Sequence, residues 1–307
     1  MVSAEIIEIV KKDFRQTPQF ARFIESKGFK TKTLKNGSIF HEFSLGPISI
    51  IKSFRPTLDE QALKEVQEIA NQKNNLICKI APNFEFEQLL SLKQNYKIVN
   101  SVMSPTKTLI RDLTQDLDSI FSSFSESTKY KINRSIREKD RIEIIQNPTN
   151  VDINKFYDNL EDRQKFKKFE TFSRKEVRFI SNSFWNDSYI ISAYSKDNKL
   201  IISNLYFKFG EKVVYFAGGL NSENSKSKAG FQLILEAFKF FKNLGVKVYD
   251  FEGLSDERDP YNAKHWGNGF TEFKLKFAKE EIYYPKTIIK YNNFVFRQIS
   301  NIFGGLY

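Results

Sequence analysis

The sequence predicts an α/β (α+β) fold of two similar domains, each with a mixed, twisted sheet flanked by helices. Its 307 residues suffice for two domains that each bury a core. Residues 213–253 alternate as strand, helix and strand, which is the pattern of a βαβ unit. The first half repeats this order around a helix predicted at 57–74. The polar, proline-containing segment 147–151 separates the halves, so we expect domains at 1–147 and 148–307.

The predicted helix of the βαβ unit spans 229–244 and is followed by Gly245, a residue suited to end a helix. Its apolar side chains recur every three or four residues and form one face, at Phe231, Ile234, Leu235, Phe238 and Phe241. The strand before it contains a glycine pair at 218–219, where another segment can approach the backbone closely. The strand after it brings Tyr249 and Asp250 to its carboxyl end, where α/β sheets bind ligands.

The remaining segments supply further elements in order. Residues 3–25 predict interrupted helices, and 84–94 a short helix. Residues 117–138 predict amphipathic helices with a strongly basic exposed side. Three strands in a meander follow at 188–220, separated by short polar turns. The pattern at 285–307 predicts a C-terminal helix.

The composition restricts the kind of partner. A net charge of +11 and a pI near 9.4 indicate a polyanionic partner, whether nucleic acid, phosphorylated metabolite or anionic lipid, unless they reflect only a skewed genome. Cys78 is the single cysteine, and His41 and His265 are the two histidines, so we expect no disulfide, no metal and no cofactor. Neither a signal peptide nor an apolar run of about 18 residues is apparent, which predicts a cytoplasmic protein.

The order of motifs in the second half resembles a known family. A strand containing AGG, an amphipathic helix, YDFEG and then FKLKF are similar to the second domain of the FemABX aminoacyltransferases. These enzymes build the peptide bridges of bacterial peptidoglycan from aminoacyl-tRNA. Segments 16–28 and 127–139 resemble further parts of the family, and the lack of a heptad repeat over 150–230 resembles its compact, armless members. The resemblance implies two tandem GNAT-like domains, the first on the acceptor side and the second on the aminoacyl-tRNA side.

The same resemblance implies a site for a phosphorylated acceptor. A lysine in the opening segment of the family contacts the sugar-nucleotide part of the acceptor, and a basic segment borders the acceptor cleft. A solvated helix face is the alternative explanation for that basic segment. A basic residue after the first helix of the second domain also reaches the acceptor, and Arg163, Lys167 and Lys168 all fit this description. The expected acceptor-binding residues are Lys27, Lys129, Lys131, Arg134, Arg163 and Tyr249.

Transfer of an aminoacyl group to an amine needs neither a protein nucleophile nor a metal, because the donor is already an activated ester. The protein must position the reactants, accept a proton and stabilise the tetrahedral oxyanion. The resemblance assigns the oxyanion to Lys274 of FKLKF, and Asp250 is a candidate proton acceptor or a turn cap. Phe273 is expected to stack on the terminal adenine of tRNA or to pack in the core. Lys276 and Lys228 are expected to contact the RNA backbone.

We therefore expect an aminoacyltransferase that moves an amino acid from aminoacyl-tRNA to the amine of a peptidoglycan precursor stem peptide. The expected acceptor is UDP-MurNAc-pentapeptide or lipid II, with peripheral contact at the inner face of the bacterial membrane. Two alternatives remain. An acyl-CoA-dependent N-acyltransferase of the GNAT class usually has a glycine-rich pyrophosphate loop, whereas residues 222–231 contain one glycine. A noncatalytic RNA-binding protein would explain the charge but not the repeated fold.

Overall fold

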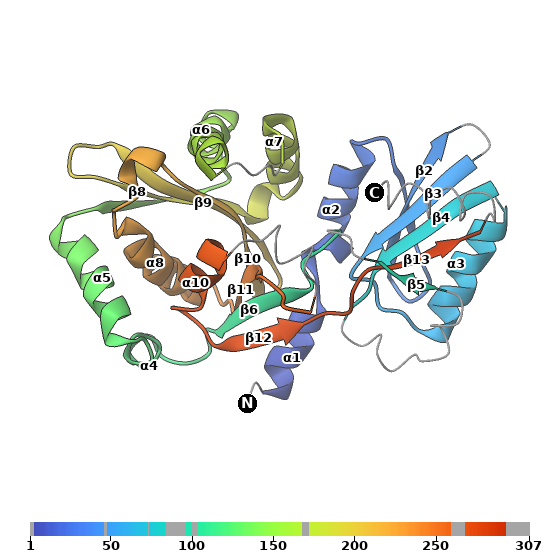
Figure 1. The fold of residues 1–307 in the computed structure, drawn as a ribbon, viewed down its shortest axis with the longest axis horizontal. Coiled ribbons are helices and arrows are strands. Elements are labelled where there is room, and N and C mark those ends of the chain that lie inside the picture. The colour runs from blue at the N-terminus through green and yellow to red at the C-terminus, as the bar shows by residue number, and fades with distance from the viewer. Residues whose placement is uncertain are drawn as a thin grey trace. The chain divides into compact units, whose positions relative to one another are not determined.

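The chain forms two compact units (Figure 1). The first, here called the seven-stranded unit, comprises Met1–Val10, Thr108–Glu252 and Asn268–Ile282. The second, the six-stranded unit, comprises Lys11–Lys107, Gly253–Gly267 and Tyr283–Tyr307. The computed structural model describes residues 3–45, 48–72, 74–83, 96–99, 103–167, 172–258 and 268–292.

These units divide the chain differently from the expected boundary after residue 147. Strand β6 (Lys107–Asp112) precedes that boundary, yet it lies beside β11 (Val248–Gly253) in the seven-stranded sheet. Conversely, β13 (Ile288–Tyr291) pairs with β4 (Asn74–Ala81) in the six-stranded sheet. The pattern of a strand predicts its extended backbone but not its sheet, so these exchanges leave no local signal in the sequence.

The seven-stranded sheet has the order β12-β6-β11-β10-β9-β8-β7. The predicted meander is confirmed, because β8, β9 and β10 are antiparallel neighbours. The predicted βαβ unit is also confirmed, since β10 pairs in parallel with β11. The bounds of its other strands are β7 (Arg141–Gln146), β8 (Ser188–Tyr194), β9 (Leu200–Phe209), β10 (Lys212–Leu220) and β12 (Glu280–Tyr283).

Helices cover both faces of this sheet (Figure 1). One face carries α6 (Asn150–Lys167) and α7 (Arg174–Ser183). The other carries α8 (Ala229–Asn243), against which α5 (Glu126–Arg137) packs. Shorter elements of the unit are α1 (Ala4–Lys11), α4 (Leu117–Ser122), α10 (Asn268–Lys274), η4 (Trp185–Asp187) and η5 (Ser222–Asn224).

The apolar face of α8 forms the centre of the core. Phe238 and Phe241 are fully buried there, and the ring of Phe238 lies 4.8 Å from that of Tyr249. Burial of each such side chain contributes about 1.5–3 kcal/mol. Gly245 has a φ of +76°, which favours glycine directly after the helix, as the sequence predicts.

The six-stranded sheet has the order β1-β2-β3-β4-β13-β5. Its strands β3 and β4 are parallel, and α3 (Glu60–Gln72) connects them within the helix predicted at 57–74. The predicted interruption near residue 17 is also present, since the Thr17 hydroxyl accepts a hydrogen bond from the Phe20 amide at the start of α2. The remaining bounds are η1 (Phe14–Gln16), α2 (Pro18–Glu25), β1 (Lys30–Thr33), β2 (Ile39–Leu45), β3 (Ile48–Phe54) and β5 (Lys97–Ile98).

The prediction of a helix at 285–307 is wrong in its first part. Ile288 and Ile289 lie in β13, where β-branched side chains suit a buried strand. Residues 293–307 lie outside the described part of the chain, as do the helix expected at 84–94, Lys168 and His265. None of the helices that the structure describes has the length and apolar character needed to cross a bilayer.

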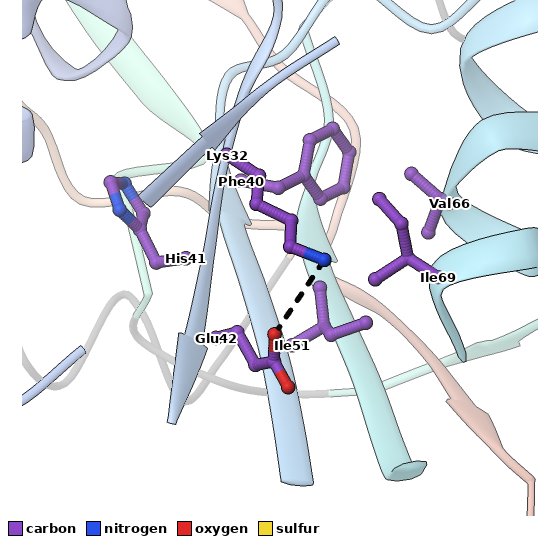
Figure 2. Close-up of a pocket in the computed structure, with 7 residues that line it drawn as sticks. All are labelled: Lys32, Phe40, His41, Glu42, Ile51, Val66 and Ile69. Carbon is purple, nitrogen blue, oxygen red and sulfur yellow. Dashed lines mark ion pairs between the residues drawn. The ribbon is translucent and has the colours of Figure 1, made fainter. Parts of the chain in front are cut away.

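A small cavity lies between β2, β3 and α3 (Figure 2). Its volume is about 10 Å³, roughly that of a single water-sized sphere, so it is a packing gap rather than a ligand site. Figure 2 shows Lys32 reaching to the buried Glu42, with Nζ 3.8 Å from the carboxylate. His41 points to the opposite side of the sheet.

Candidate active site of the seven-stranded unit

A pocket of about 250 Å³, here called the first pocket, lies along β10. The strands β10 and β11 pair only as far as Val214 and Asp250, and a bulge between Tyr215 and Ala217 then shifts the register of β10. The pocket follows this point, near the strand ends where α/β sheets place their ligands. Its lining includes Tyr215 and Gly218 of β10, Lys228 and Phe231 at the start of α8, Phe270 and Phe273 of α10, and Arg163 of α6.

Lys274 is the last residue of α10, and its side chain is only 7% exposed. Burial lowers the pKa of Lys274 to about 8, while the carboxylates of Glu252 and Asp250 oppose the shift. Its Nζ lies 5.8 Å from the ring centroid of Tyr215, a residue of the first pocket. At neutral pH Lys274 is therefore a largely desolvated cation beside the pocket wall.

The carboxylate of Asp250 is fully engaged within the protein. Its Oδ2 lies 3.1 Å from Nζ of Lys212, which is also buried. Its Oδ1 accepts hydrogen bonds from the Thr108 hydroxyl at 2.5 Å and from the Glu252 amide at 2.8 Å. The last bond is the turn cap that the sequence offered as the alternative, and it supports a backbone with φ of +58° at Glu252.

Tyr249, expected to contact the acceptor, is instead fully buried in the core. Its hydroxyl donates to the hydroxyl of Tyr206 at 3.2 Å. The hydroxyl oxygen of Tyr206 also accepts a hydrogen bond from Nδ2 of Asn204 at 3.1 Å. Oδ1 of Asn204 in turn accepts one from the Tyr215 hydroxyl at 3.0 Å. These bonds connect Tyr249 to the pocket wall and fix the orientation of Tyr215, so Tyr249 acts on the site only through its neighbours.

Sequence reasoning missed Tyr215 and Asn204. Both fall in strands whose alternating pattern predicts sheet and nothing more. The signal available nearby was the glycine pair after Tyr215. A Cβ at Gly218 would meet the Tyr215 hydroxyl and Oδ1 of Asn204, so this glycine leaves room for that hydrogen bond.

Three predicted lysines come together at the edge of the first pocket, and we call them the lysine cluster: Lys131, Lys228 and Lys276. Burial lowers the pKa of Lys131, and the nearby charges of Lys276 and Lys228 lower it further. Its Nζ lies 5.0 Å from the ring centroid of Phe231. None of the three forms an ion pair with a residue of the described chain. Lys131 was assigned to the acceptor and the other two to tRNA, but the fold places them in one patch.

Arg163 also joins this site. It lines the first pocket from α6, with its guanidinium 5.9 Å from the ring centroid of Phe270. Burial lowers the pKa of Arg163, although the group stays charged at neutral pH. Phe273 lines the same pocket, and its ring lies 5.3 Å from that of Phe231. The face of Phe273 is thus part of an aromatic wall next to cationic side chains.

The other predicted acceptor residues are not part of this group. Lys129 and Arg134 lie on α5, where they pair with Glu126 at 2.9 Å and Glu138 at 2.7 Å. Such exposed pairs are typical of a solvated helix face. Lys27 belongs to the six-stranded unit, where its Nζ lies 4.6 Å from the ring centroid of Phe23. The acceptor role of these three residues stays a prediction.

Residues suited to hold a metal are not gathered in the described chain. No three His, Cys, Asp or Glu side chains group there as ligands would. Burial raises the pKa of Cys78 to about 12 and lowers that of His41 to about 4, so both are neutral at pH 7. The cations around the first pocket suit an anionic ligand.

Solved structures with the same fold include the crystal structure of FemX. It matches with a TM-score of 0.78 over 98% of each chain, at 14% identity. L-PGS from Bacillus licheniformis matches with a TM-score of 0.59 at 15% identity, over 94% of this chain and 98% of that one. The C-terminal domain of a protein assigned as a lysylphosphatidylglycerol synthetase from Agrobacterium fabrum matches with a TM-score of 0.58 at 12% identity, over 96% and 92%.

Comparison of the amino-acid sequence gives less than comparison of the fold. Residues 91–206 match the family model of IS200-like transposases, which is less than half of the chain and includes neither unit completely. No curated protein matches the sequence significantly. The likeness to FemX confirms the predicted fold class, two GNAT-like units with mixed sheets flanked by helices. The chain thus shares its fold with FemX and L-PGS.

Proposed function

We propose that the protein is an aminoacyltransferase that moves an amino acid from aminoacyl-tRNA to the amine of a peptidoglycan precursor stem peptide. The observation that carries the proposal is the buried cation of Lys274, placed beside Tyr215 where β10 and β11 part. The FemX-like fold over nearly the whole chain supports it, as does the lysine cluster at the edge of the first pocket.

The proposed reaction joins the acceptor amine to the carbonyl carbon of the aminoacyl ester. A C–N bond forms, the carbonyl oxygen becomes an oxyanion, and the ammonium of Lys274 stabilises that charge. The tetrahedral intermediate then breaks the C–O bond to the ribose. The ribose oxygen takes up a proton, and the attacking nitrogen loses one to water or to a nearby base. Because Lys274 is desolvated, its charge acts more strongly than an exposed lysine would.

We assign a supporting role to Asp250. Its two oxygens already bind Lys212, Thr108 and the Glu252 amide, so it is less suited to accept a proton from a substrate. Instead its negative charge favours the protonated form of Lys274. Asp250 therefore helps to keep the proposed oxyanion-stabilising group charged.

The start of α8 favours an RNA donor over acyl-CoA. A pyrophosphate site at a helix N-terminus needs free amide donors. Here the Ala229 amide donates to the Ser227 hydroxyl at 3.1 Å, and the Phe231 amide donates to the Lys228 carbonyl at 2.9 Å. The positive charge at this place comes instead from lysine side chains, which suit the phosphates of RNA.

The test is to incubate the protein with a pool of charged tRNAs and with either UDP-MurNAc-pentapeptide or lipid II. Mass spectrometry should detect an acceptor heavier by one aminoacyl residue. Phosphatidylglycerol serves as a third acceptor, since the relatives include a lysylphosphatidylglycerol synthetase.

Lys274→Met should lower the rate of transfer about 100-fold or more. Lys196→Gln, a charge loss at an exposed turn, is the control. Transfer from acetyl-CoA alone, or full activity of Lys274→Met, would overturn the proposal.

A further inference from the structure

A larger pocket of about 560 Å³, here called the second pocket, lies in the same unit. Its walls come from the end of β6, the junction of α4 and α5, and the segment 275–280 that connects α10 to β12. The proposed chemistry does not use this pocket. Its volume is nevertheless within the range of ligand sites, which run from roughly 300 to 1,000 Å³.

The second pocket is lined by more cations than anions. Arg111, Lys276 and Lys279 face Asp112 and Glu280 around it. No ion pair joins any of these five side chains to one another or to another residue of the described chain. Oδ1 of Asp112 accepts hydrogen bonds from the Thr114 amide and hydroxyl, at 2.8 and 2.7 Å, and the charge of Asp112 acts on Arg111 without forming an ion pair. The lysine and arginine charges are thus available to an anion in the pocket.

Arg111 is the best-fixed of these cations. Its Nη2 donates to the Ser123 hydroxyl at 3.0 Å, its Nη1 donates to the Phe277 carbonyl at 3.5 Å, and its guanidinium lies 5.8 Å from the ring centroid of Phe124. Its Nε is buried and has no hydrogen-bond partner in the described chain. Each terminal nitrogen of a guanidinium held in this way retains one N–H, and the two together match the oxygens of a phosphate.

The two pockets adjoin one another through shared aromatic packing. Phe124 and Phe277 line the second pocket, with ring centroids 5.7 Å apart. Phe277 lies 5.6 Å from Phe231, which lines the first pocket. Lys276 lines the second pocket and also belongs to the lysine cluster beside Phe231. Lys276 is therefore a cation shared by the second pocket and the lysine cluster.

We propose that the second pocket binds a backbone phosphate of the RNA donor, upstream of the terminal nucleotide held at the first pocket. Arg111 and Lys279 are the residues that contact this phosphate. The proposal rests on the proposed function, since it needs an RNA whose end lies at the first pocket. The second pocket then increases the affinity for the RNA donor and positions it along the site, while the chemistry takes place at Lys274.

The experiment compares two probes that differ in reach. One is a hairpin RNA with an acceptor stem and a single-stranded 3′ end, and the other is adenosine, the terminal nucleoside, which has no phosphate to offer the second pocket. Arg111→Gln and Lys279→Gln should each raise the Kd of the hairpin about 3- to 10-fold and reduce the slope of log Kd against log salt by about 0.9. Both should change the Kd of adenosine less than twofold.

Two controls keep the outcomes separate. Lys196→Gln removes an exposed charge from the turn after β8, and Arg141→Gln removes an arginine from β7, so neither should alter hairpin binding. Lys279 is exposed, so its replacement tests the site even where Arg111→Gln fails to fold. If wild type transfers from aminoacyl-tRNA but both variants bind the hairpin like the controls, the second-pocket proposal is overturned alone. If wild type neither binds RNA nor transfers, the proposed function is overturned with it.

Discussion

Nζ of Lys212 lies 3.1 Å from Oδ2 of Asp250, and both side chains are almost completely buried. Lys212 also donates to the carbonyl of Val10 at 3.3 Å, so the ion pair connects β10, β11 and the first helix of the chain. A buried pair of this kind is costly to break, because the remaining charge has no solvent to compensate it. The pair thus anchors β11 beside the place where Lys274 lies.

Replacing Asp250 by Asn should destabilise the fold without acting directly on the chemistry. The free energy of unfolding is expected to fall by about 3 kcal/mol, since Lys212 would stay buried without a counter-ion. Urea denaturation followed by circular dichroism measures this loss. Adding Lys212→Met to Asp250→Asn should recover much of it. An Asp250→Asn protein as stable as wild type but inactive would instead identify Asp250 as the proton acceptor.

Replacing Lys274 by Met should have opposite effects on stability and activity. Burial lowers the pKa of Lys274 from 10.5 to about 8, which corresponds to a cost of about 3 kcal/mol for the buried charge. Lys274→Met should therefore raise the free energy of unfolding at pH 7, by about 2 kcal/mol, while it removes transfer. Thermal unfolding and the transfer assay measure the two effects. A destabilised Lys274→Met protein would show that the ammonium has a structural role.

The activity should also depend on pH through Lys274. The group loses its charge as pH rises through about 8, so the rate of transfer should fall above that value. Lys274→Arg keeps the charge at all these pH values and should shift the decline upward, at a lower maximal rate. The measurement is the pH dependence of kcat for both proteins. An identical decline in Lys274→Arg would assign it to another group.

Much of the fold follows from pattern. The spacing of Phe231, Phe238 and Phe241 predicts α8, and the glycine after residue 244 predicts its end, because both depend on neighbouring residues alone. The exchange of β6 and β13 between the units could not be predicted in this way. Which sheet a strand joins depends on residues more than a hundred positions distant, such as the partner of Ile288 in β4.

The candidate site was predictable in its parts but not in its grouping. Motif resemblance selected Lys274, Phe273 and Lys276, and the structure places all three in α10 or directly after it. It could not place Lys131 beside Lys228, because that depends on the packing of α5 against α8. Nor could it place Tyr249 in the core, since a tyrosine in a strand has the same local pattern whether it faces ligand or protein, and Tyr249 is the second residue of β11.

His41 should make the stability of the protein depend on pH. Burial lowers its pKa from 6.5 to about 4. Between these values the unfolded chain binds more protons, so the free energy of unfolding falls as pH decreases from 6.5 to 4, by up to about 3 kcal/mol. His41→Asn keeps a side chain that can donate or accept a hydrogen bond with Thr31, and it should flatten this dependence. Urea denaturation at several pH values measures it.

The control is Lys196→Gln, a substitution at an exposed turn that removes no group titrating between pH 4 and 6.5. It should leave the pH dependence of stability as in wild type. Acidic side chains also titrate below pH 5, so the quantity to compare is the difference between each variant and wild type at the same pH. A flat difference for His41→Asn would mean that His41 titrates equally in the folded and unfolded chain.

Gly219 should tolerate no side chain, whereas Gly218 should tolerate one at a smaller cost in stability. A Cβ at Gly219 would lie 2.8 Å from backbone atoms of Leu160, because α6 crosses β10 there and Asn159 donates to the Gly219 carbonyl. Gly219→Ala must push helix and strand apart and should lower the free energy of unfolding by about 2–3 kcal/mol. The three atoms nearest to a Cβ at Gly218 belong instead to the side chains of Tyr215 and Asn204, and displacing them breaks the hydrogen bond between these two residues. Gly218→Ala should therefore disturb the pocket wall and the rate of transfer more than stability. Thermal unfolding of the two variants compares their losses of stability. Equal losses would mean that α6 shifts to accommodate a Cβ at as little cost as the side chains do.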